Sequence, residues 1–123
     1  MAVVNGINFL PGDDISGYDF IDADFSGVDL TLVNLSGANL TGAIFDGSWL
    51  RYTDFSGANL TGANFEGSII ADGYSESDPG FPYPRQVDFT GADLSEANFS
   101  QVNLSQTNPV SYTHLTLPTK RIV

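Results

Sequence analysis

The sequence predicts an all-β repeat protein, a solenoid whose chain turns a corner every five residues. Three observations lead to this prediction. A large apolar residue recurs at every fifth position, a small or β-branched residue lies two positions before it, and turn-forming residues occupy the remaining positions. A period of five fits neither the α-helix nor the simple strand, whose periods are about 3.6 and 2 residues. The chain of 123 residues is expected to form a single domain.

The large residues define the buried column of the predicted solenoid. They are Phe20, Phe25, Leu30, Leu35, Leu40, Phe45, Leu50, Phe55, Leu60, Phe65 and Ile70. Asp or Asn commonly precedes each of them, and Ser or Thr followed by Gly commonly comes after, as in Ser36-Gly37 and Thr41-Gly42. Asp, Asn, Ser and Gly are turn formers. Since a narrow column has room for one bulky side chain per corner, the second inward position is small.

Residues 38–42, 58–62 and 92–96 resemble the A-(D/N)-L-x-x signature of the pentapeptide repeat family, and the resemblance extends over residues 15–108. It implies a right-handed quadrilateral parallel β-helix of about four coils, with four repeats per coil. Residues twenty apart would then stack on four faces. The implied stacks are Phe20, Leu40 and Leu60; Phe25, Phe45 and Phe65; Leu30, Leu50 and Ile70; and Ile15, Leu35 and Phe55.

The repeat is interrupted after Ile70 and resumes at Phe89. The separation of 19 positions between these two residues exceeds one repeat step of five by 14, which predicts an inserted loop at residues 71–84. Prolines and glycines in this segment are unfavourable for a sheet. If the coil resumes in order, four pairs stack across the insertion: Phe89 on Phe55, Leu94 on Leu60, Phe99 on Phe65, and Leu104 on Ile70.

The two ends depart from the repeat. Residues 1–14 are predicted to cap the solenoid, with Val3, Val4, Ile7, Phe9 and Leu10 filling the end of the core. The β-helix is predicted to occupy residues 15–109. Residues 110–119 resemble the translated read-through of a sequencing adapter, so residues 110–123 are interpreted as a non-native tail. A C-terminal cap strand is the alternative.

The charge restricts the class of partner. The chain has 15 acidic and 4 basic residues, a net charge of −11, and no cysteine. An acidic surface repels phosphates, so neither direct nucleic-acid binding nor association with an anionic membrane is expected. Neither a signal peptide nor a membrane-spanning run is recognised at the N-terminus, and a cytoplasmic location is expected.

No motif for catalysis or cofactor binding is recognised. The single histidine, His114, lies in the tail segment, and no nucleophile–base set or phosphate loop is present. We therefore expect neither an enzyme nor a cofactor or metal site. The acids of residues 13–29 suggest calcium, but a solvated acidic face is the favoured interpretation.

Departures from the repeat predict a contact surface. Apolar residues replace the expected Asp or Asn at Ile44, Trp49 and Ile69, and the expected turn glycine at Leu32 and Tyr52. The candidate interaction patch comprises Leu32, Trp49, Arg51, Tyr52, Ile69, Tyr74, Phe81 and Tyr83. Exposed Trp, Tyr and Arg are typical of binding hot spots. Alternatively, the aromatic residues of the loop fold back and bury Trp49 and Tyr52.

The function that follows is a non-enzymatic scaffold, a protein–protein interaction module whose partner is an unknown protein or a second copy of the chain. The alternative rests on the family resemblance. Some pentapeptide repeat proteins mimic B-form DNA and bind DNA gyrase, which confers quinolone resistance or toxin immunity. The acid excess here has the same sign, although it is concentrated at residues 13–29.

Overall fold

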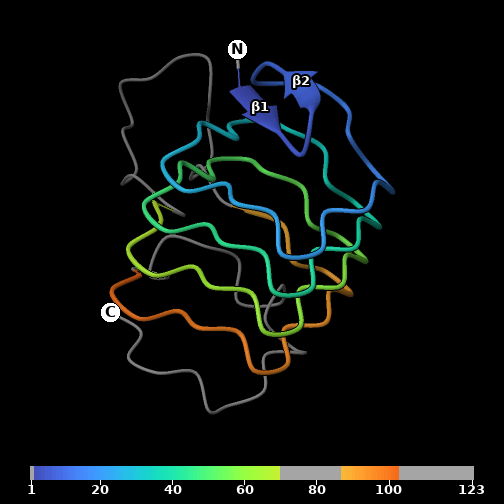
Figure 1. Cartoon of the computed structure of the whole chain (residues 1–123). Helices are drawn as coiled ribbons and strands as arrows, with labels where there is room; N and C mark the ends of the chain where they lie inside the picture. The colour runs from blue at the N-terminus through green and yellow to red at the C-terminus, as the bar shows by residue number, and fades with distance from the viewer. Residues whose placement is uncertain (1, 70–86, 103–123) are drawn as a thin grey trace, which may run out of the picture.

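The coils of the computed structural model stack in chain order beneath a short N-terminal hairpin (Figure 1). The structure describes residues 2–69 and 87–102. Within these ranges the named strands are β1 (Ala2–Val4) and β2 (Ile7–Phe9), and the repeats contribute single parallel bridges instead of longer strands. No helix in the same ranges is long and apolar enough to cross a lipid bilayer.

Strands β1 and β2 form an antiparallel hairpin in which Val4 pairs with Ile7. The turn is Asn5-Gly6, with φ of 50° and 77°. Positive φ at both central residues is the type I′ turn that Asn-Gly favours, because its twist matches that of the strands. The pair Asn-Gly was therefore a hairpin signal in the sequence, in a segment predicted only as a cap.

Side chains alternate between the two sides of the hairpin, so only one side reaches the core. Val4 and Phe9 are buried, whereas Val3 and Leu10 are 60% and 51% exposed. Ile7 is partly buried against the core. The expectation that Val3 and Leu10 fill the end of the core was wrong. Val3 lies on the outer side of its strand, and Leu10 follows the last strand residue.

The coils stack with residues twenty apart in register on four faces. The bridges run Asp14–Asn34–Asp54, Asp19–Asn39–Asn59, Asp24–Ile44–Asn64 and Asp29–Trp49–Ile69. We number the faces by their buried residues: face 1 holds Phe20, Leu40 and Leu60; face 2 Phe25, Phe45 and Phe65; face 3 Leu30 and Leu50; and face 4 Ile15, Leu35 and Phe55. The coils are residues 13–32, 33–52, 53–69 and 87–102, the last two being the described parts.

The register continues across the insertion as predicted. Asp54 bridges Asp88, and Asn59 bridges Asp93. The N–H of Leu60 donates to the carbonyl oxygen of Asp93 at 2.8 Å. The pair Leu104–Ile70 and the loop 71–84 fall outside the described residues.

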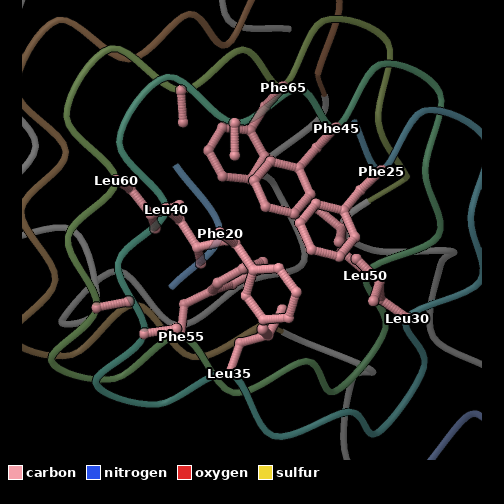
Figure 2. Packing of buried hydrophobic residues seen from close by; sticks show 14 of the residues in the cluster. Phe20, Phe25, Leu30, Leu35, Leu40, Phe45, Leu50, Phe55, Leu60 and Phe65 are labelled. Carbon is pink, nitrogen blue, oxygen red and sulfur yellow. The ribbon is translucent and has the colours of Figure 1, made fainter. Parts of the chain in front are cut away.

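An aromatic stack forms one side of the core, and Figure 2 shows its rings lying in parallel. The centroids of Phe25 and Phe45 are 5.0 Å apart, and those of Phe45 and Phe65 are 4.7 Å apart, with interplanar angles of 4° and 7°. Three polar side chains, those of Ser48, Thr53 and Ser68, are buried in the column. Ser48 Oγ donates to the Phe45 carbonyl and Thr53 Oγ1 to the Leu30 carbonyl, both at 2.8 Å. These bonds satisfy the hydroxyls of Ser48 and Thr53.

The Asp or Asn that precedes each buried residue closes a turn. Its Oδ1 accepts the N–H of the residue two positions later, as in the bond from Ser16 to Asp14 at 3.0 Å. The same bond is made by Asp19, Asp24, Asp29, Asn34, Asn39, Asp54, Asn59, Asn64, Asp88, Asp93 and Asn98. This is the Asx-turn, which both Asp and Asn form. Acids at this position therefore have a structural role.

Candidate functional site

The described members of the candidate patch gather on face 3. We call Leu32, Trp49, Arg51, Tyr52 and Ile69 the face 3 patch. Trp49 bridges Asp29 on one side and Ile69 on the other. Leu32 and Trp49 are 50% and 40% exposed, and the other three side chains are partly buried. Neighbouring coils therefore bring together residues that are up to 37 positions apart in the sequence.

Trp49 replaces a residue that closes a turn elsewhere. In the same coil, Asn39 Oδ1 accepts the N–H of Thr41 at 3.3 Å. An indole has no acceptor to offer the N–H of Arg51. Trp49 therefore cannot form the Asx-turn at this corner, and its aromatic side chain is exposed. The repeat pattern does not require an aromatic residue at this position.

Two bulky residues hold a left-handed backbone at the corner beside Trp49. Leu32 and Tyr52 have φ of 62° and 58°, and the other repeat residues besides glycine with positive φ are the polar Asp22, Glu96 and Gln101. The corner that follows the buried residues of face 4 has glycine in each described coil, at Gly17, Gly37, Gly57 and Gly91. A left-handed conformation costs an L-residue other than glycine about 1–2 kcal/mol. Such strain is concentrated at functional sites.

Arg51 gives the patch a cation. Its Cζ lies 5.0 Å from the centroid of the Trp49 ring, within the range of a cation–π contact. The Thr31 hydroxyl, which donates to Asp29, lowers the pKa of that carboxyl, and the Arg51 charge lowers it further. In residues 2–69 and 87–102, Arg51 is the only basic side chain. The surface is therefore apolar, with one cation and one carboxylate close together.

The other predicted members of the patch are Tyr74, Phe81 and Tyr83. All three lie outside the described residues. The hypothesis that the loop covers Trp49 and Tyr52 therefore stays a prediction.

The acids of the first coil form turns and face solvent. Asp14 and Asp24 are exposed, and hydrogen bonds from Ser16 and Ser26 lower the pKa of their carboxyl groups. No group of three or more potential metal ligands occurs among the residues that the structure describes.

On face 2, burial raises the pKa of Asp46, and the charges of Glu66 and Asp24 raise it further.

A second exposed surface was missed in the sequence. Tyr18 and Ile21 in the first coil are 46% and 48% exposed. The hairpin, which includes Val3 in β1 and is followed by Leu10, lies at the same end of the solenoid (Figure 1). Tyr18 occupies the inward position that later coils fill with alanine. Its size at that position was the available signal, because a ring cannot fit where the column accepts only a methyl group.

A family model described as "Pentapeptide repeats" matches eight copies in this chain, at residues 14–47, 45–70 and 85–108. No curated protein matches the sequence.

Solved structures of pentapeptide repeat proteins are similar to the chain. A protein of the Arabidopsis thaliana thylakoid lumen has 27% identity and a TM-score of 0.39, with 78% of this chain covered. Rfr23 from the cyanobacterium Cyanothece 51142 has 19% identity and a TM-score of 0.46, with 79% covered. QnrB1, a plasmid-mediated fluoroquinolone resistance protein, has 22% identity and a TM-score of 0.47, with 79% covered.

The chain covers 53%, 58% and 58% of the lengths of these three proteins, so it spans little more than half of each. The family match, in contrast, extends over most of the chain in eight copies, and the coil register agrees with it. The fold is the right-handed quadrilateral parallel β-helix. The protein belongs to the pentapeptide repeat family.

Proposed function

We propose that this protein is a non-enzymatic scaffold that binds a protein partner through the face 3 patch. The observation that supports the proposal most is the backbone at Leu32 and Tyr52. Two bulky residues hold a left-handed conformation at a corner where glycine would adopt the same backbone without steric strain. The exposed side chains of Leu32 and Trp49 lie beside it.

The composition of the patch fits a protein surface. Trp, Tyr and Arg are enriched among residues that dominate binding energy, because large rigid side chains bury much area at little entropic cost. Arg51 also provides a donor next to the Trp49 ring. A partner with an apolar centre and an acceptor group at its edge would satisfy both features.

The test is affinity capture with three immobilised baits, each the full chain. The first is the wild type, and the second has Leu32→Gly, Trp49→Asn and Tyr52→Gly, which restore repeat residues. The third, a control, has Asp54→Asn, Asp88→Asn and Asp93→Asn on faces 4 and 1, where Asn keeps the Asx-turn. A partner should be retained by the wild type and the control and lost by the second bait. Equal retention by all three baits would contradict the proposal.

Mimicry of DNA is the second candidate, supported by the acid excess. The twelve acids of the described residues include six in residues 13–29, however, and Asn39 and Asn59 hold the stacked positions above Asp19. The acids therefore do not form a continuous face along the described coils, as a mimic of DNA would require. A gyrase supercoiling assay tests this candidate, and absence of inhibition at micromolar protein would exclude it.

A further inference from the structure

We propose that the N-terminal end of the solenoid is a second docking surface, which binds an extended, basic polypeptide segment of another protein. This surface adjoins the face 3 patch at Asp29, which bridges Trp49, and shares none of the five residues of that patch. Its apolar members are Val3, Leu10, Tyr18 and Ile21, and its acidic members are Asp13, Asp14, Asp19, Asp22, Asp24 and Asp29. We call these ten residues the N-terminal surface.

Exposed apolar side chains are concentrated at this end. In the described part of the chain, six large apolar residues are exposed, and four of them belong to the N-terminal surface, with exposures between 46% and 60%. The two others are Leu32 and Trp49 of the face 3 patch. A cluster of exposed apolar side chains on a soluble protein is typical of a contact surface.

The first coil also has an open strand edge. In the second coil, the N–H of Asn39 donates to the carbonyl of Tyr18 at 3.0 Å, and that of Ile44 to the carbonyl of Ala23 at 2.9 Å. Within residues 2–69 and 87–102, the equivalent N–H groups of Asp19 and Asp24 have no backbone acceptor. The two N–H groups lie on adjacent faces, and an extended segment that adds to the edge of one face supplies the acceptor there, which is the mode of β-strand addition.

The negative charge of the N-terminal surface favours a basic segment over a second copy of this chain. All six carboxylates of the N-terminal surface are exposed, and Arg51, the one base among the described residues, lies on the next coil. Two copies of this chain that met end to end would place six carboxylates against six, which is unfavourable. A segment with Lys or Arg between apolar residues complements both the carboxylates and the apolar side chains.

An open groove at the same end offers room for a side chain. Its volume is about 460 Å³, and it is lined by Ala2, Pro11, Gly27, Val28 and Asp29. Three of these residues present an apolar side chain, and Asp29 places a carboxylate at the margin. An apolar or long basic side chain fits this lining, because the methylene stem of Lys or Arg buries well while its charge stays near the carboxylate.

Removing the charge at three turns tests the proposal without removing the turns. Asp14→Asn, Asp19→Asn and Asp24→Asn keep the acceptor for the N–H two residues later, as Asn34 and Asn39 show. The matched control is the Asp54→Asn, Asp88→Asn and Asp93→Asn variant, which loses the same charge at the same repeat position. The probe is a labelled short peptide in which lysine and valine alternate, and binding is followed by fluorescence anisotropy.

The wild type and the control should bind the peptide with equal affinity. The first variant should bind it at least about fivefold more weakly, since three exposed charge pairs are lost. The amide resonances of Tyr18 and Ile21 should shift on binding. A peptide that alternates glutamate and valine should not bind. The variant with Leu32→Gly, Trp49→Asn and Tyr52→Gly should keep its affinity for the peptide, which separates this proposal from the proposed function.

Two results would overturn the proposal. Equal weakening in both charge variants would mean that the peptide responds only to net charge. If the acids serve only to keep copies of this chain apart, the first variant would self-associate in sedimentation experiments while its affinity for the peptide stayed unchanged.

Discussion

Phe99 lies over Phe65 with ring centroids 4.8 Å apart and planes 5° from parallel, although 34 residues separate the two in the sequence. Phe45 lies over Phe25 in the same way at a separation of 20. The stack is thus unaffected by the fourteen additional residues, and each coil contributes one ring. The solenoid depends on the order of its repeats, which the insertion leaves intact.

Deleting residues 71–84 should therefore preserve the fold. The deletion returns Phe65 and Phe99 to the separation of 20 that Phe25 and Phe45 have. We expect an unchanged circular dichroism spectrum and a single cooperative thermal transition close to that of the wild type. A broad or split transition would show that the insertion is needed to align the fourth coil.

Phe45→Ala should be strongly destabilising. The ring is fully buried between Phe25 and Phe65. Truncation of a buried Phe costs about 3–5 kcal/mol, because contacts are lost and a cavity remains. Phe45→Leu should reduce the free energy of unfolding less, since Leu40 is the corresponding buried residue on face 1 of the same coil. Urea unfolding measures both, and a loss below about 1 kcal/mol for Phe45→Ala would contradict tight packing of the stack.

Asn59→Ala tests the Asx-turn. Asn59 Oδ1 accepts from the Thr61 N–H at 3.1 Å and from the Thr61 hydroxyl at 2.7 Å. Losing this acceptor should reduce the free energy of unfolding by about 1 kcal/mol. Asn59→Asp is the control, because Asp54 closes the same turn. Equal stability of the alanine and aspartate variants would show that the bond does not stabilise the coil.

Asp46→Asn should stabilise the protein at neutral pH. Burial, together with Glu66 and Asp24, raises the pKa of Asp46, so its ionised form destabilises the folded state. Protonation removes this penalty as the pH falls through the raised pKa. The difference in melting temperature between variant and wild type should therefore be positive at pH 7 and shrink towards acid pH. A difference independent of pH would point to a cause other than charge.

Much of the fold follows from the sequence because a solenoid repeats one local rule. The spacing of Phe20 and its successors predicts which side chains enter the column, and the excess of fourteen residues predicts the register beyond the insertion. The hairpin at the N-terminus obeys a different rule, a period of two with an Asn-Gly turn. Because the five-residue pattern does not apply there, the prediction that Val3 and Leu10 enter the core is wrong.

The sequence predicts candidate site residues only where an outward-facing position departs from the residue that the repeat expects. Trp49 and Leu32 depart from the repeat residues at their positions, so the sequence identifies them. Tyr18 departs at an inward position, where a large residue is expected to disturb packing. Among the described residues, the N-terminal hairpin and no further coil lies above the first coil, so the exposure of Tyr18 depends on its position in the solenoid and not on the local pattern.

The central claim is that Leu32, Trp49 and Tyr52 are present for binding and not for folding. The free energy of unfolding of the variant with Leu32→Gly, Trp49→Asn and Tyr52→Gly tests it most directly. Relief of the left-handed backbone at two residues predicts a stability equal to the wild type or higher, by up to about 2 kcal/mol. A loss of more than about 1 kcal/mol would show that these side chains support the coil and would contradict the claim.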